Sequence, residues 1–116
     1  MSYSVTFLSK PYGQRTALSV LHVATTSAEN AYVDVTNLIR IGAINLGTQI
    51  QSFGAAVVPS FTMADPDFAS LIANDALVPW DVKASQASGI IGSYFVVPTV
   101  VRLAFSAPGT VYLTVF

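Results

Sequence analysis

The sequence lacks cysteine entirely, and it contains only one histidine and one tryptophan among its 116 residues. Without cysteine the chain can form neither disulfides nor thiolate metal sites. Any catalytic pair built on imidazole would have to use His22, which lies in an apolar segment where a structural role is the commoner one. The sequence also has no nucleophile elbow, phosphate-binding loop or dinucleotide fingerprint. We therefore expect a non-enzymatic protein with no catalytic residue and no cofactor.

Charged residues are scarce as well. Five basic and six acidic residues make up 9% of the chain, whereas an ordinary soluble domain has about 25%. The formal charge of −1 and the absence of a basic cluster argue against direct nucleic-acid binding. With 53% hydrophobic residues, a free monomer would expose much uncharged surface, and such surfaces tend to associate. The composition therefore predicts a homo-oligomer.

Long apolar runs suited to a membrane are missing. The longest uncharged run, 41–64, contains Asn45, two glutamines, three glycines and Pro59, which make it too polar and too broken for a spanning helix. The N-terminal residues MSYSVTFLSK have neither a basic start nor an apolar stretch typical of a secretory signal. We expect no membrane association and no signal peptide.

What the sequence does contain is a strong strand pattern at its C-terminal end, in the segment 95–116. Apolar residues alternate with others on both sides of Pro108-Gly109, at Val101, Leu103, Phe105, Val111, Leu113 and Val115. Proline followed by glycine is typical of a turn. The pattern predicts a β-hairpin with Phe105 opposite Leu113, Leu103 opposite Val115, and a three-residue loop of Pro108, Gly109 and Thr110. Gly109 is expected to take a positive φ angle there.

Other segments also predict short strands. Tyr3, Val5 and Phe7 alternate with polar residues, and so do Ala31, Val33 and Val35. The pattern of 16–24 fits a strand or two helical turns, and its β-branched residues favour a strand. The apolar runs 38–41, 44–46 and 55–58 are separated by glycines and are interpreted as further strands. Many short strands with frequent turn signals predict an all-β fold, an antiparallel β-sandwich or jelly roll, forming a single domain over 1–116.

One short helix is predicted near residues 66–74. Asp65 can cap its N-terminus, Pro66 suits the first helical position, and Asp67 is favourable at the positive end of the helix dipole. These two aspartates belong to an acidic cluster with Asp75 and Asp81, which could in principle bind calcium or act as an acid–base pair. No EF-hand spacing exists and capping already accounts for Asp65 and Asp67. We therefore favour structural roles and expect no metal site.

Aromatic residues provide the remaining candidates. Trp80, together with Tyr12, Tyr32 and Tyr94, raises the possibility of sugar stacking, although a single tryptophan in a domain of this size is more often part of the core. Tyr112 and Phe116 lie on the side of the last strand opposite its apolar face, which suits a subunit interface or contact with a second sheet. The candidate interface residues are Trp80, Tyr112 and Phe116.

The part of the chain from Ile41 onward resembles small β-sandwich virion structural proteins of tailed bacteriophages, either head decoration (cement) or tail-associated proteins. The resemblance is carried by INLG at 44–47, VVPSFTMADPDF at 57–68, VPWDV at 78–82 and VVRLAFSAPGTVYLTVF at 100–116. The helical insertion 65–75 departs from the pattern, and the first forty residues lie outside it.

This resemblance implies a capsid decoration or cement protein that stabilises a phage head by added interface. Its partners would be copies of itself, as a trimer by analogy with proteins on threefold positions of shells, and the major capsid or other virion proteins. Its location would be the virion, assembled in the host cytoplasm. The alternatives are a receptor- or glycan-binding module of a tail fibre or adaptor and, third, a small β-sandwich enzyme.

Overall fold

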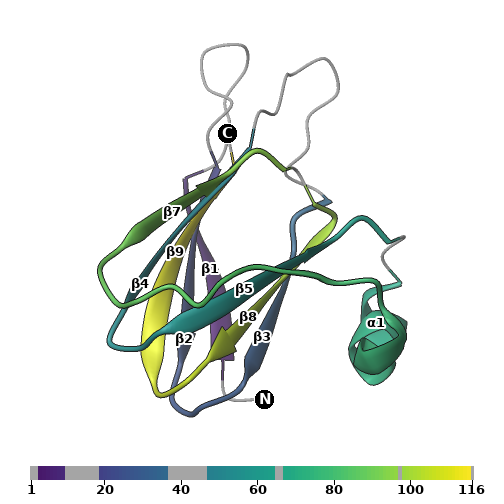
Figure 1. Cartoon of the computed structure of the whole chain (residues 1–116), viewed down its shortest axis with the longest axis horizontal. Coiled ribbons are helices and arrows are strands. Elements are labelled where there is room, and N and C mark those ends of the chain that lie inside the picture. The colour runs from purple at the N-terminus through teal and green to yellow at the C-terminus, as the bar shows by residue number, and fades with distance from the viewer. Residues whose placement is uncertain (1–2, 10–18, 37–46, 65–66, 97, 116) are drawn as a thin grey trace.

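The computed structural model describes residues 3–9, 19–36, 47–64, 67–96 and 98–115. Antiparallel strands in two sheets dominate it, with one short α-helix and one 3-10 turn (Figure 1). The predicted all-β sandwich fold is therefore confirmed. The elements, in chain order, are β1 (Tyr3–Ser9), β2 (Ser19–Thr25), β3 (Asn30–Asp34), β4 (Thr48–Phe53), β5 (Val57–Thr62), α1 (Phe68–Ala73), η2 (Asp75–Leu77), β6 (Asp81–Val82), β7 (Ile91–Tyr94), β8 (Val100–Phe105) and β9 (Gly109–Val115).

The pairing of the strands defines a jelly roll. Sheet A has the order β1-β2-β9-β4-β7, and sheet B has the order β3-β8-β5-β6. Four pairs, β2 with β9, β3 with β8, β4 with β7 and β5 with β6, make one long hairpin that closes between β5 and β6. Rolling this hairpin adds the pairs β4 with β9 and β5 with β8. Such a rolled double sheet is the jelly-roll arrangement, and β1 is an additional edge strand beside β2.

The core lies between the two sheets. Its largest fully buried side chains include Phe61, Leu21, Ile50, Leu103 and Leu113. Along β2, β4 and β9 buried residues alternate with more exposed ones, because successive side chains of a strand point to opposite faces. The alternating apolar residues of β8 and β9 are all buried, so the prediction that they face one core is confirmed.

The predicted hairpin between β8 and β9 is wrong. β8 pairs with β3 and β5 in sheet B, whereas β9 pairs with β2 and β4 in sheet A. The connection 106–108 thus crosses from one sheet to the other. The alternation fits a hairpin within one sheet and also two strands in facing sheets. In both cases every second side chain of each strand points into the same core. Leu113 consequently lies opposite Leu21 and Ile50, and Phe105 lies opposite Val57.

Gly109 also differs from its predicted conformation. Among the described glycines the positive φ angles belong to Gly54 and Gly89, each at 83°, and Gly109 is the first residue of β9. A Cβ atom built on Gly109 would lie 2.8 Å from the carbonyl oxygen of Phe53 and 2.9 Å from the Cβ of Ala55. Glycine is therefore required at position 109 because β4 and the turn after it approach too closely for a side chain. The predicted reason, a positive φ angle in a turn, does not apply.

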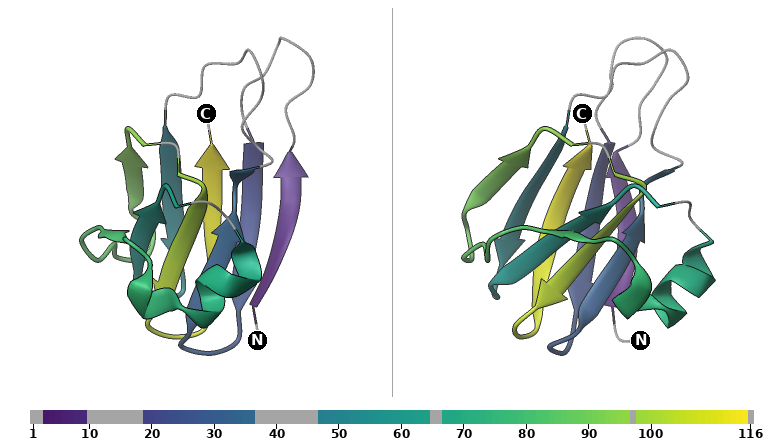
Figure 2. Two further views of the ribbon diagram at one scale, coloured as in Figure 1. Left: turned by 90° about the vertical axis from the view of Figure 1, so that its right-hand side faces the viewer. Right: turned by 45° about the vertical axis from the view of Figure 1, so that its right-hand side comes forward.

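The predicted short helix is confirmed as α1, although its start differs. It begins at Phe68, and Asp67 is the N-cap, where its carboxylate accepts a hydrogen bond of 3.4 Å from the Ser70 amide. The predicted cap, Asp65, is therefore wrong, and Asp65 and Pro66 lie outside the described residues. The helix rests on the outer side of sheet B (Figure 2), where Leu71 packs with Tyr32 and Val100.

The ambiguous segment 16–24 overlaps the strand β2, and the run 55–58 overlaps the start of β5. The runs 38–41 and 44–46 lie outside the described residues. In the part of the chain that the structure describes, no helix has the length and apolar character needed to cross a membrane.

Candidate binding surface

The outer face of sheet A crosses five strands, and we call it the sheet A face. Its residues are those that alternate with the core-facing residues of the same strands. One row crosses all five strands, because Thr6, His22, Tyr112, Gln51 and Ile91 pair in succession. None of the described side chains on this face carries a formal charge at neutral pH. They are Ser4, Thr6, Val20, His22, Ala24, Gln49, Gln51, Phe53, Ile91, Ser93, Thr110, Tyr112 and Thr114.

An aromatic group marks the middle of the sheet A face. Tyr112 stands on the central strand β9 with 38% of its surface exposed. Its ring lies 5.2 Å from the His22 ring on β2 and 5.8 Å from the Phe53 ring on β4, the latter edge-on at 81°. Such tilted contacts hold the rings in place, and a tyrosine presents an apolar ring together with a polar hydroxyl. The outward position of Tyr112 agrees with the sequence analysis, and its role in an interface stays a prediction. Phe116 lies outside the described residues.

Amide side chains border this aromatic group on the β4 side. The Gln49 Nε2 donates a 3.2 Å hydrogen bond to the Ser93 hydroxyl, and the Gln51 Nε2 donates a 3.1 Å hydrogen bond to the Gly89 carbonyl. These bonds connect β4 to β7 and to the turn before it. The face is therefore an ordered surface of rings, hydroxyls and amides, suited to contact with another uncharged surface and without the paired groups needed for acid–base chemistry.

Trp80 lies on the opposite side of the molecule, above the outer face of sheet B. Its indole Nε1 donates a 3.1 Å hydrogen bond to the Asp75 carbonyl, and the Arg102 guanidinium lies 4.6 Å from the centre of its ring. Its ring is also tilted against Tyr32 at 6.2 Å. Trp80 and Tyr112 thus lie on opposite sides of the sandwich, and the contacts of Trp80 with Asp75, Arg102 and Tyr32 are all within the chain. Its predicted interface role stays a prediction.

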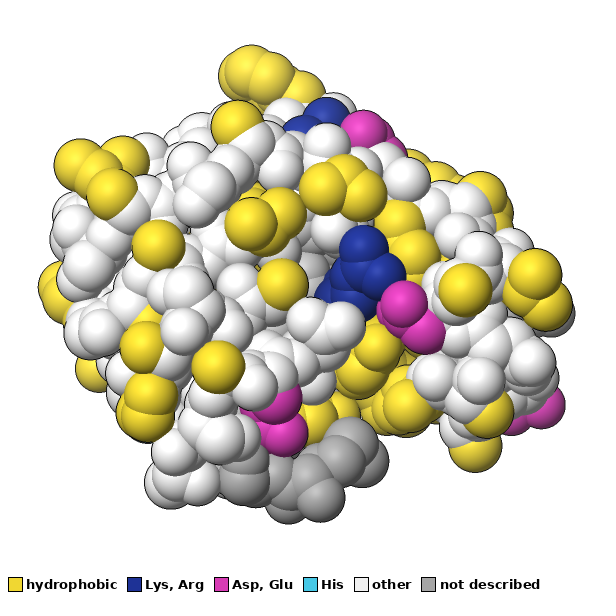
Figure 3. Space-filling view, turned by 60° about the horizontal axis from the view of Figure 1, so that its bottom comes forward, with side chains coloured by type: hydrophobic (Ala, Val, Ile, Leu, Met, Phe, Trp, Pro, Cys, Tyr) yellow, Lys and Arg dark blue, Asp and Glu magenta, His cyan; other side chains and the backbone are white. Residues whose placement is uncertain are grey.

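Arg102 is the centre of the polar contacts on this side. Its Nη1 donates to both carboxylate oxygens of Asp75, at 2.8 and 2.9 Å, and its Nη2 donates to the Ser60 hydroxyl at 3.3 Å. The Tyr32 hydroxyl donates to the same carboxylate at 3.0 Å, and burial is the main reason that the pKa of Tyr32 is raised. Figure 3 shows a basic side chain touching an acidic one between the body of the molecule and the α1 segment. These contacts attach η2 to sheet B, so they have a structural role.

The acidic cluster considered in the sequence is not brought together. Asp67 caps α1, Asp75 contacts Arg102, and Asp81 forms an exposed ion pair with Lys83 at 2.8 Å. Asp65 lies outside the described residues. No group of three or more potential metal ligands occurs among the residues that the structure describes.

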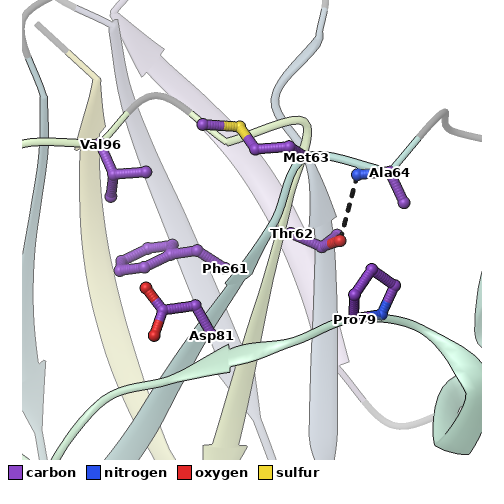
Figure 4. A pocket seen from close by; sticks show the side chains of 7 residues that line it. All are labelled: Phe61, Thr62, Met63, Ala64, Pro79, Asp81 and Val96. Atoms are coloured by element: carbon purple, nitrogen blue, oxygen red, sulfur yellow. Dashed lines mark hydrogen bonds between the residues drawn. The ribbon is translucent and has the colours of Figure 1, made fainter.

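An apolar pocket of about 540 Å³ lies where β5 ends, next to the start of β6 (Figure 4). Phe61 reaches it from the core, and Met63 covers one side with 63% of its surface exposed. The carboxylate of Asp81 is the charged group of its described lining, and this group already contacts Lys83. The pocket can accept an apolar group, but it offers no second charged partner to activate a substrate. Its lining residues are Phe61, Thr62, Met63, Ala64, Pro79, Asp81 and Val96.

Sequence reasoning missed two parts of the sheet A face. His22 was interpreted as belonging to an apolar segment, yet the alternation of Leu21 and Val23 around it would place it outward once that segment is taken as a strand. Phe53 gave no such signal, since its contact with Tyr112 depends on the pairing of β4 with β9, which the sequence does not reveal.

Comparisons with known proteins provide a fold but no family. No protein-family profile matches the chain, and no curated protein matches it. A solved structure of similar fold is an HTH_3 family transcriptional regulator from Vibrio cholerae, with a TM-score of 0.55 and 10% identity. The match covers 99% of this chain and 51% of that regulator, so this chain spans about half of its length.

At this identity the likeness concerns the fold alone. It contradicts the resemblance to virion structural proteins of tailed bacteriophages, because the matched structure is a transcriptional regulator and no virion protein was found. The motifs that suggested the resemblance are strand patterns that any small β-sandwich can contain.

Proposed function

We propose that this chain is a non-enzymatic structural module that associates with a second copy of itself through the sheet A face. The observation that carries the proposal is that none of the described side chains of this five-stranded face is formally charged, while Tyr112 and Phe53 are exposed on it. Charged residues normally keep the surfaces of soluble domains apart from their copies. A face without them and with aromatic residues at its centre has the composition of an interface core.

The size of the face fits a dimer contact. Five strands spaced about 4.8 Å apart, each about six residues long at about 3.3 Å per residue, cover roughly 480 Å². Two copies would bury roughly 1,000 Å², the lower bound for a specific interface. A twofold axis would place the same patch of both copies in contact, and such a contact closes without leaving a face on which fibres could grow.

A role in capsid decoration followed from the resemblance to virion proteins, and it has lost that support. Glycan or receptor binding stays a prediction, and so does a trimer. The absence of enzymatic activity also stays a prediction, in keeping with the separate contacts of Asp75 with Arg102 and of Asp81 with Lys83.

Sedimentation velocity of the purified full chain tests the proposal with Gln51→Lys as the main variant. Gln51 pairs with Tyr112 at the centre of the face, so a lysine there would bring like charges of two copies together across a twofold axis. We expect the wild-type chain to sediment at twice its 12.2 kDa mass and the variant to sediment as a monomer.

Leu77→Lys is the matched control, because Leu77 is 83% exposed on η2, away from the sheet A face. It should leave the dimer unchanged. A wild-type monomer at all concentrations, or a dimer that persists in Gln51→Lys, would contradict the proposal. Circular dichroism confirms that each variant is folded.

A further inference from the structure

The two sheets differ in width at one side of the sandwich. Sheet A ends with β1 and sheet B ends with β3, and residues of both strands line one groove of about 280 Å³, together with Leu21 of β2 and Phe68 of α1. Because sheet A has five strands and sheet B has four, β1 extends beyond β3 without a strand of sheet B beneath it. The left view of Figure 2 shows β1 at this outer side of the molecule.

The side of β1 that faces the groove is apolar. Val5 pairs with Val23 and Phe7 pairs with Leu21, so their side chains lie on the core side of sheet A. Yet Val5 and Phe7 are 37% and 43% exposed, whereas Val23 and Leu21 are buried. Tyr3 lies on the same side and lines the same groove. The core side of β1 is thus apolar but only partly buried.

The neighbouring edge of β3 carries backbone groups that point toward the same space. The Val35 amide donates to the Thr99 carbonyl and the Phe105 amide donates to the Glu29 carbonyl, so the odd-numbered residues of this segment bond to β8. In an antiparallel strand the alternate residues then direct N–H and C=O groups to the other side. Those residues are Asn30, Tyr32 and Asp34, and no described strand pairs with that side of β3.

We propose that this groove binds a single extended segment of a partner polypeptide, which pairs as a fifth strand of sheet B with the edge of β3 that no described strand occupies. The added strand would satisfy the outward backbone groups of β3, and every second side chain would pack against Tyr3, Val5 and Phe7. Addition of a strand to a sheet edge derives affinity from backbone bonds and specificity from alternate side chains.

The overhang of β1 decides between possible occupants. If a second folded copy paired its own β3 with this edge, its β2 would have to occupy the position that β1 already fills above the groove. A single strand that carries no second sheet fits without this collision. The occupant is therefore an extended segment and not the edge of another sandwich, so this contact is distinct from dimerisation through the sheet A face.

Charge adds a sequence preference. The Asp34 carboxylate lines the groove at the end of β3 and accepts a 2.9 Å hydrogen bond from the Thr36 amide. A segment with alternating apolar residues and a lysine or arginine near Asp34 is the best match, since opposite charges on adjacent strands stabilise the pair.

Fluorescence anisotropy with a labelled peptide tests the proposal on the full chain. The probe is acetyl-KVTVTVK-amide, and its control is the same peptide with alternate amide nitrogens methylated, which removes the backbone donors. We expect the probe to bind and the methylated peptide to bind at least tenfold more weakly. Val5→Lys should weaken binding of the probe at least tenfold by placing a charge in the groove, and Asp34→Lys should weaken it severalfold.

Gln51→Lys is the matched control, because it lies on the sheet A face and should leave peptide affinity unchanged even where it abolishes the dimer. This variant thereby distinguishes a failure of the proposed dimer from a failure of the proposed peptide binding. Amide hydrogen exchange of the wild-type chain gives a second measurement that needs no variant, and the peptide should protect Asn30, Tyr32 and Asp34. Absence of probe binding, equal binding of the methylated peptide, unchanged affinity of a folded Val5→Lys, or unprotected β3 amides would each overturn the proposal.

Discussion

Gly109→Ala is expected to destabilise the fold through a steric conflict between β9 and the turn after β4. The added Cβ would lie 2.8 Å from the Phe53 carbonyl oxygen and 2.9 Å from the Ala55 Cβ. Favourable contacts of a carbon atom lie at about 3.5–4.0 Å. Neither neighbouring atom can move by rotation of a side chain, because one belongs to the backbone and the other is fixed to it. The end of β4 must therefore shift away from β9.

The cost of such overpacking is about 1–3 kcal/mol. The entropy of unfolding is about 2.1 cal/mol/K per residue, so a loss of about 2 kcal/mol lowers the Tm of a chain of 116 residues by about 8 °C. Thermal unfolding followed by circular dichroism measures this shift. All variants must be compared at one protein concentration, because self-association would raise the Tm by mass action.

Gly89→Asn is the control for Gly109→Ala. Gly89 belongs to a turn, where no atom lies within 4 Å of its added Cβ, and asparagine tolerates its φ of 83° better than other residues. We expect its Tm to fall by no more than about 2 °C. If Gly109→Ala melts like the wild-type chain, or no lower than Gly89→Asn, the close approach of β4 and β9 is not what requires glycine at this position.

Two further predictions concern polar groups. Asp75→Ala removes the carboxylate that contacts the largely buried Arg102, and it should lower the free energy of unfolding in urea by about 2–3 kcal/mol. Asp81→Ala removes an exposed partner of Lys83 and should lower it by less than about 1 kcal/mol. Equal losses would show that the contact does not hold η2 on sheet B. Burial raises the pKa of Tyr94 above its ordinary value, so the unfolded chain loses this proton first as the pH rises. The contribution of Tyr94 is therefore fully present below about pH 10 and is lost as the pH rises through the folded pKa. Unfolding free energies measured from pH 9 to 11.5 should fall less steeply in Tyr94→Phe, and a parallel decline would contradict the assignment.

Local patterns in the sequence predicted which residues are buried but not which strands pair. Val101, Leu103 and Phe105 share a side because of the period of two, and this much depends only on neighbouring residues. Their pairing with β3 and β5 depends on contacts far apart in the chain, and the turn signal at Pro108-Gly109 fits both a hairpin and a crossing between sheets. The short helix was predictable because capping is local, although two nearby aspartates left its first residue ambiguous.

The candidate binding surface could be predicted only in part for the same reason. The outward position of Tyr112 follows from the alternation within β9. The ring contacts with His22 and Phe53 join residues of three strands that meet only in the folded sheet. Gln86 is a similar case, because its buried amide donates to the carbonyls of Ile50 and Ile90, and its sequence neighbours give no sign of burial.

The outer faces of the two sheets differ in how they are covered, and this difference is why association is expected at sheet A. On sheet B, the segment 67–80 lies over the outward side chains of Tyr32 and Arg102, and the Asp75 carboxylate pairs with the Arg102 guanidinium there. This face is thus covered by the chain itself. No described segment covers the sheet A face, and the charged side chains that the structure describes all lie elsewhere. Since an uncharged face with exposed aromatic residues gains free energy from burial, we propose a second copy as the partner that covers the sheet A face.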